Sequence, residues 1–339
     1  MQIKKMILSI VLGSIVFSGC ATKVNTTTVV PAEINRAAKI KRIAVTNFTK
    51  DNIGLSPKVE TELVSTKIKG KKYFVVANRG DLDKVIRESK IQSEDIFDTK
   101  TAVKIGDLLG VQAIVTGVVS KTYSEDQSFY EGRSKCGDKK CTYTVDYKVR
   151  CTKRTVGMSG NIKLIDIERG DIIHTEGLDN TSVSKHCSDQ SGGLPSKDAL
   201  LNAMANTAAK TFVYKLSPHE IAYQIVLLED PDIDYTDNEE KLLENFIIVM
   251  KAGRTDKGEK FAKQLVELTK GKSYVSIYNL GVIQELNGQT QEALKSFIAA
   301  DSLVVTTVPE ISKALTRIRL ISKNTEKFKK DSEIRANVK

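Results

Sequence analysis

Short apolar runs alternate with helix-like stripes over residues 41–119. The runs at 41–48, 72–77 and 111–119 have the length and the β-branched content of buried strands. Between them apolar residues recur every three or four positions, and Gly110 follows the last stripe, where a helix commonly ends. The order strand, helix, strand, two helices, strand predicts helices packed on a sheet.

In the following residues the pattern predicts antiparallel strands. Every second residue between Thr142 and Cys151 is apolar or aromatic, whereas residues 121–135 carry charges and show no such alternation. Segments 155–167 and 171–181 flank Glu168-Arg169-Gly170 and predict a hairpin.

A long helix and a short strand close this part of the chain. Ser196 is a predicted N-cap for a helix that ends near Leu216, and residues 221–228 form a predicted closing strand. Residues 40–229 are therefore expected to form one α/β (α+β) domain with a mixed sheet and flanking helices.

Helical periodicity dominates the rest, from 238 to 323. The spacing of small and large residues between Tyr274 and Ala300 matches the tetratricopeptide repeat, in which small residues allow helices to approach closely; the residues concerned are Leu280, Gly281, Gly288, Ala293, Phe297 and Ala300. A degenerate copy lies about 35 residues upstream. These residues predict a small all-α tetratricopeptide-like domain, with a bundle of unrelated helices as the alternative, followed by a charged tail at 324–339.

The N-terminus resembles a bacterial lipoprotein signal. Lys4 and Lys5 precede an apolar stretch too short for a transmembrane helix, and Phe17-Ser18-Gly19-Cys20 resembles the lipobox. The resemblance implies that residues 1–19 are removed, that Cys20 carries diacylglycerol and acyl chains such as palmitate, and that 20–39 form a tether. Ala21 stands where an inner-membrane retention signal has Asp, which favours the periplasmic face of the outer membrane. An ordinary secretory signal is the alternative.

The net charge and the distribution of Lys and Arg restrict the expected binding partners only slightly. The formal charge is +10, and removal of the signal leaves +8 because two lysines go with it. Lys and Arg are scattered and only 6% of residues are aromatic, so no basic stripe with stacking residues predicts a nucleic-acid partner. Anionic lipid, lipopolysaccharide or cell wall is the expected counterpart of this charge.

Catalytic spacings are missing from the sequence. His174, His186 and His219 show no HExxH arrangement, and no serine lies in a G-x-S-x-G context. Met158-Ser159-Gly160 falls in a predicted strand, where a nucleophile elbow does not form. We therefore expect neither an enzyme nor a cofactor.

Four further cysteines suggest disulfides, since an exported chain with an even number commonly pairs them. A zinc site that includes His186 is the weaker alternative. Cys136 and Cys141 flank a predicted turn, and in the hairpin register centred on Arg169 Cys151 lies opposite Cys187. The register predicts the disulfides Cys136–Cys141 and Cys151–Cys187 and no metal.

Several blocks together resemble the curli production assembly/transport (CsgG) family, over roughly residues 40–225. They are the segments 43–48, 73–79 with Leu82, 102–117 and 162–170. The same superfamily takes in the penicillin-binding-protein activator lipoproteins and the N-terminal domain of TolB. The resemblance implies a periplasmic α/β domain that binds other envelope components and carries no chemistry of its own.

Channel subunits of this family add two long amphipathic hairpins. Their places here are 121–154 and Asn180–Leu194. In the first, Thr142–Cys151 could serve as a membrane strand, but the strand before it is charged and shows no apolar alternation; the second is too short. We therefore expect a non-catalytic, outer-membrane-anchored periplasmic lipoprotein that serves as a binding or assembly component of an envelope machine. The alternative is a subunit of a curli-like oligomeric secretion channel, and homo-oligomerisation is open in either case.

Overall fold

The computed structural model describes residues 21–89 and 98–337. The signal segment and Cys20 lie outside these residues. The described chain divides into two compact units, residues 29–221 with 323–337 and residues 21–28 with 222–322, and each is taken by itself.

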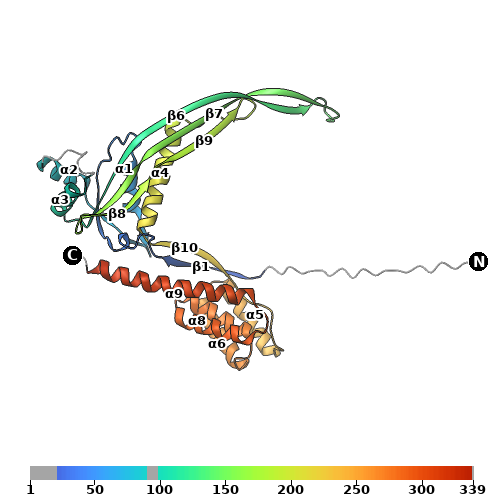
Figure 1. The fold of residues 1–339 in the computed structure, drawn as a ribbon. Helices are drawn as coiled ribbons and strands as arrows, with labels where there is room; N and C mark the ends of the chain where they lie inside the picture. The colour runs from blue at the N-terminus through green and yellow to red at the C-terminus, as the bar shows by residue number, and fades with distance from the viewer. Residues whose placement is uncertain (1–20, 90–97, 338–339) are drawn as a thin grey trace, which may run out of the picture. The chain divides into compact units, whose positions relative to one another are not determined.

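A mixed sheet organises the first unit (Figure 1). Its strands run in the order β5, β2, β6, β7, β8; the bounds are β2 Arg42–Val45, β5 Val75–Val76, β6 Ala113–Cys136, β7 Thr144–Asp166 and β8 Ile172–Gly177. The pairs β2–β5 and β2–β6 are parallel, and β6–β7 and β7–β8 are antiparallel. A further strand, β9 (Asn180–Cys187), pairs with another stretch of β7.

Helices cover both faces of this sheet. Ile43, Val45 and Val115 point into a core shared with α1 (Leu55–Ser65) and α4 (Lys197–Leu216), as Figure 1 shows for α4. Their neighbours Ala44 and Ile114 face the opposite core, with α2 (Arg79–Glu88) and α3 (Thr99–Leu109). Alternation of side chains along each strand thus explains why the central runs are apolar throughout.

Capping explains where these helices begin and end. The Ser196 hydroxyl accepts from the Ala199 N–H, as predicted. Gly110 ends α3 in the left-handed conformation with φ +61°. The first helix begins at Leu55, where the Asp51 carboxylate accepts from the N–H groups of Leu55 and Ser56.

The helical region consists of α5 (Asp237–Lys251), α6 (Thr255–Leu268), α7 (Tyr274–Leu286), α8 (Thr290–Leu303) and the first half of α9 (Pro309–Ala336). Thr236 and Glu239 form a capping box at the start of α5. Successive helices from α5 to α8 pack on one another around a common core. A mixed α+β sheet unit followed by helices confirms the predicted fold class.

In three segments the structure goes beyond what the local sequence pattern indicates. Part of the expected tether forms β1 (Lys23–Val30), which pairs with β10 (His219–Val226) in a separate two-stranded sheet, so the predicted closing strand does not join the main sheet. The charged tail is helical to Ala336 as part of α9. Residues 121–135 belong to β6 despite their charges. In each case the segment contacts residues that are distant in the sequence or exposed to solvent. The local periodicity of apolar residues does not reveal such contacts.

Candidate functional site

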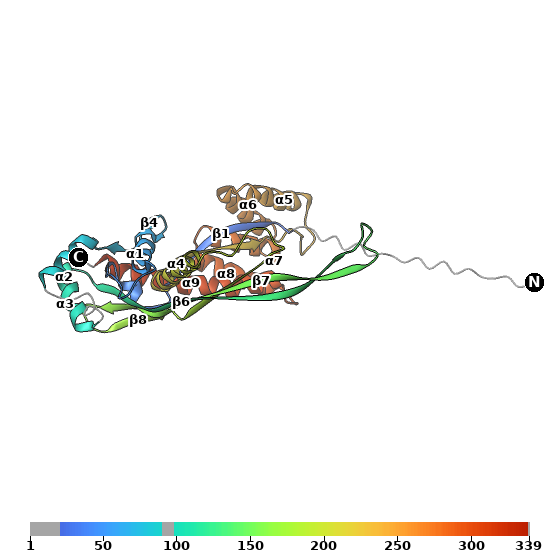
Figure 2. The ribbon, with the colours of Figure 1, turned by 90° about the horizontal axis from the view of Figure 1, so that it is seen from above.

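An antiparallel hairpin continues beyond the core of the sheet. The main core ends near Val119 on β6 and near Val156 on β7, but the strands stay paired from Lys121↔Ser159 to Cys136↔Thr144. We call residues 121–159 the hairpin arm; Figures 1 and 2 show its strands side by side up to the tip. Most of the arm therefore lies beyond the core that stabilises the rest of the sheet.

A β-bulge marks the base of the arm. The register shifts between Val119 and Lys121, and the opposing Gly160 has φ +150°. A Cβ at Gly160 would overlap the carbonyl oxygen of Val118, so glycine is required there. Bulges bend a strand and increase its twist, and this one sets the direction in which the arm leaves the sheet.

Both predicted disulfides are present in the arm. Cys136–Cys141 closes the turn at the tip, and Cys151–Cys187 joins β7 to the end of β9. Cys151 and Cys187 are direct partners in the β7–β9 register, so the sequence-derived register is confirmed at this point.

A small apolar cluster surrounds the second disulfide. Val149, Cys151 and Cys187 are at most 5% exposed, and Phe129 packs against them from β6. This cluster is separate from the two cores of the sheet. It holds β6, β7 and β9 together beyond the cores of the sheet.

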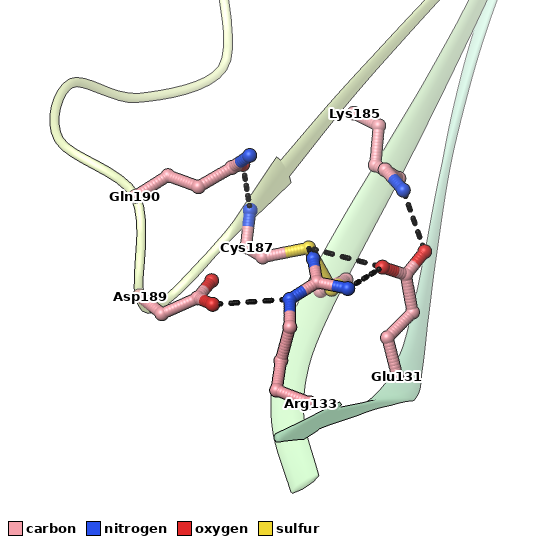
Figure 3. Close-up of a disulfide and its surroundings, with 7 residues drawn as sticks. Glu131, Arg133, Lys185, Cys187, Asp189 and Gln190 are labelled. Atoms are coloured by element: carbon pink, nitrogen blue, oxygen red, sulfur yellow. Dashed lines mark hydrogen bonds and ion pairs between the residues drawn. A yellow bond between two sulfur atoms is a disulfide. The ribbon is translucent and has the colours of Figure 1, made fainter. Parts of the chain in front are cut away.

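Charged side chains close over this cluster (Figure 3). Glu131 accepts from Lys185 Nζ at 2.5 Å and pairs with Arg133 at 2.9 Å. Arg133 also reaches Asp189 at 3.2 Å, and its Nη2 lies 3.8 Å from the sulfur of Cys187. We call Glu131, Arg133, Lys185 and Asp189 the ion-pair lattice; it joins β6, β9 and the loop after β9.

The lattice shifts the ionisation of its members. The hydrogen bond from Lys185, followed by the charges of Lys185 and Arg133, lowers the pKa of Glu131. The hydrogen bond to Asp189 raises the pKa of Arg133. Both shifts favour the charged forms of Glu131 and Arg133, so the lattice works as an electrostatic clamp.

The opposite face of the arm is different. Tyr130 is 69% exposed and lies directly across from Arg150, next to Gly132 and its partner Lys148. Two further tyrosines do not belong to this face: Tyr147, which is 36% exposed, is the register partner of Arg133 on the lattice face, and Tyr143, which is 58% exposed, lies near the tip. This face of the arm therefore combines the exposed Tyr130 with the cations Lys148 and Arg150.

The histidines occupy three different strands. His174 hydrogen-bonds Glu176 at 3.0 Å, His186 is the register partner of Thr152, and His219 stacks on Tyr214. Within the described chain, the one group with the composition of a metal site is Glu131 with Cys151 and Cys187. Its two sulfurs form the disulfide, so they are not thiolate ligands.

The predicted repeat residues lie where α7 meets α8. Ala293, Phe297 and Ala300 are fully buried, and a Cβ on Gly281 would come within 2.7 Å of the Phe297 ring. Gly288 has φ +75° just after α7, and Leu280 is partly buried. The tetratricopeptide interpretation stays a prediction.

Sequence reasoning missed the ion-pair lattice. Glu131 and Arg133 are two apart, a spacing that places them on one face of a strand, but this segment was not expected to be a strand. In the described part of the chain, no helix is long and apolar enough to span a bilayer.

Two solved structures and a protein family are similar to this chain. Lipoprotein GNA1162 from Neisseria meningitidis is similar at 10% identity, covering 51% of this chain and 98% of its own, with a TM-score of 0.27. A PelC dodecamer from Paraburkholderia phytofirmans is similar at 15% identity, covering 58% and 99%, with a TM-score of 0.25. No curated protein has a significant sequence match. The model of the family described as "Curli production assembly/transport component CsgG" matches residues 23–214, and the chain belongs to that family.

Proposed function

We propose that this protein is a non-catalytic lipoprotein, anchored to the periplasmic face of the outer membrane through Cys20, and that it binds other cell-envelope proteins as an assembly component. The observation that carries the proposal is the hairpin arm. An exposed hairpin is marginally stable alone, yet this one is held by two disulfides, an apolar cluster and the ion-pair lattice.

The arm suits recognition because its order is established before a partner arrives. A rigid surface loses little conformational entropy on binding, and exposed tyrosines supply large contact areas with few rotatable bonds. Disulfides also persist in an oxidising compartment such as the periplasm, which fits export of the chain. The helical region, interpreted as tetratricopeptide-like repeats, would add a second binding surface.

The second candidate is a subunit of an oligomeric outer-membrane secretion channel. The length of the arm favours it, because the paired strands exceed the 9–11 residues that a membrane strand needs. Charge on both faces weighs against it: Glu125 and Lys153 lie on the face of Phe129, and Lys148 and Arg150 on the face of Tyr130. A lipid-facing surface tolerates such charges poorly.

Photocrosslinking in intact cells tests the proposal. With p-benzoylphenylalanine at Tyr130, we expect a crosslink to one other envelope protein; the matched control is the same residue at Tyr214, 46% exposed on α4. Equal crosslinking at both positions would contradict a docking role for the arm. A ladder containing only copies of this chain would favour the channel.

A further inference from the structure

A second surface lies in the helical region and shares no residue with the hairpin arm. It is a hollow of about 380 Å³ between the segment Glu229–Pro231 and α5. Leu243 and Ile247, at 3% and 6% exposure, form its floor, and Ile248 stands beside them at 61% exposure. We call this hollow the α5 groove.

Three glutamates and one lysine line the α5 groove: Glu229, Glu240, Glu244 and Lys251. Residues 229–244 contain eight carboxylates and one lysine, in a chain whose net charge is +10. Some of these carboxylates have structural roles: Asp232 accepts from the Tyr274 N–H, Glu239 completes the α5 capping box and Glu229 accepts from the Thr22 N–H. These structural roles account for Asp232, Glu239 and Glu229.

Glu240 and Glu244 have no such role. Both line the groove from exposed positions one helical turn apart, and among the described residues neither side chain has a hydrogen bond or ion pair. Lys251 stands two turns further along the same stripe of α5. The rim is thus acidic over most of its length and basic at one end.

The position of α5 in the array indicates the shape of the occupant. In a stacked helical array each helix buries one face against the helix before it and another against the helix after it. Helices α6 and α7 pack between sequence neighbours, whereas α5 is the first helix of this region and keeps Ile248 exposed. A further helix laid on α5 would cover this residue and fill the hollow.

We propose that the α5 groove binds a basic amphipathic helix of a partner protein, which packs on α5 as a preceding helix of the array. Two or three apolar side chains at helical spacing would enter the hollow, and lysine or arginine residues flanking them would pair with Glu240 and Glu244. This surface is separate from the hairpin arm, so the inference does not depend on the proposed function.

The test uses the full mature chain in detergent and a fluorescein-labelled helical peptide of about 14 residues, with leucines at positions i, i+4 and i+7 and lysines on both flanks. Fluorescence anisotropy gives the affinity. Ile248→Glu and the pair Glu240→Lys with Glu244→Lys should each weaken binding by about ten-fold or more. The matched controls Ile298→Glu and Glu292→Lys, at exposed positions of α8, should change it little.

Two peptide controls separate recognition from simple attraction of charge. A scrambled peptide of the same composition, and one with glutamate for lysine, should bind at least about ten-fold more weakly. Equal binding of the scrambled peptide, or unchanged binding to Ile248→Glu, would overturn the proposal. A change in the oligomeric mass of the peptide-free protein on Ile248→Glu would also overturn the proposal, because it would show that a second copy of the chain covers the groove. Ile248 is exposed, so this variant should fold normally, which circular dichroism checks.

Discussion

At the scale of single residues, the arm is stabilised by contacts that close over a disulfide. Arg133 lies between Glu131 and Asp189, and Lys185 holds the other oxygen of Glu131 (Figure 3). Surface ion pairs taken singly contribute little, but a lattice that shares one arginine orders several side chains at once. Its role is to fasten β9 and the following loop to the hairpin.

The pKa of Glu131 predicts how this fastening depends on pH. Because the pKa is lower in the folded state, the carboxylate stabilises the fold above the ordinary glutamate pKa of about 4.3, and this stabilisation is lost as pH falls through the folded value. Glu131→Gln should lower the urea midpoint at pH 7 and make a smaller difference at pH 4. Glu125→Gln, on the same strand and face, is the control and should show neither effect. A difference that is constant with pH would show that Glu131 acts by shape alone.

The two disulfides should differ in their effect on stability. Cys151 and Cys187 are 36 residues apart, and closing such a loop contributes about 3–4 kcal/mol in the chain-entropy model, against about 2 kcal/mol for the short loop between Cys136 and Cys141. Replacing Cys151 and Cys187 by alanine should therefore lower the melting temperature more than replacing the tip pair. The variant should also expose the segment after β9 to protease. Equal shifts for both pairs would contradict this account.

Arg335 shows why the charged C-terminus is helical. Its guanidinium is 3.8 Å from the centre of the Tyr73 ring and donates to the backbone carbonyls of Ile40 and Tyr73. Arg335→Ala should lower the free energy of unfolding of the sheet unit by about 2–4 kcal/mol, because a stacking contact and two charged hydrogen bonds are lost together. Arg335→Lys should recover little of it, since an ammonium lacks the planar fork. The exposed Arg319 on the same helix is the control for loss of charge.

At the scale of elements, helix packing depends on small residues at close approaches. Ala293 is fully buried on α8, next in the stripe to Phe297, which contacts Gly281 on α7. Side chains of successive helices therefore meet where the predicted repeat pattern places its small positions. This placement supports the repeat interpretation and predicts the effect of enlarging such a position.

Ala293→Leu should overpack the contact between α7 and α8 and destabilise the helical region by about 1–3 kcal/mol. Ala299→Leu, one position before Ala300 and exposed on the same helix, should change stability little. Thermal unfolding with limited proteolysis checks both. The sheet unit should remain resistant at temperatures where the helical region is cut; loss of both together would argue against independent units.

At the scale of the whole molecule, the proposed lipid on Cys20 decides where both surfaces act. With its signal removed, Cys20→Ser should yield a protein that fractionates with the soluble periplasmic contents; if the signal is not cleaved, it should remain as a precursor. The physical reason is that two or three acyl chains, at about 0.8 kcal/mol per buried methylene, make a stable anchor. In the proposal this anchor depends on Cys20, so the variant lacks it. Wild-type levels of the variant in purified outer membranes would show that something other than lipid holds the protein there.

Features in which burial is local and periodic could be predicted from the amino acids alone. Alternation and helical stripes predicted the central strands, the Ser196 cap of α4 and the mixed sheet with its helices, and the hairpin register placed Cys151 opposite Cys187. These features leave a signal within a short window because one face of each element meets the core.

The remaining features depend on contacts between segments that lie far apart in the chain. The β1–β10 pair joins segments almost 200 residues apart, the arm is a strand pair without a continuous apolar face, and the C-terminal part of α9 is held by Arg335. Backbone pairing and ion pairs between distant segments impose no repeating pattern on either segment. The contacts that make the arm and the α5 groove available for binding therefore became visible only once the chain was folded.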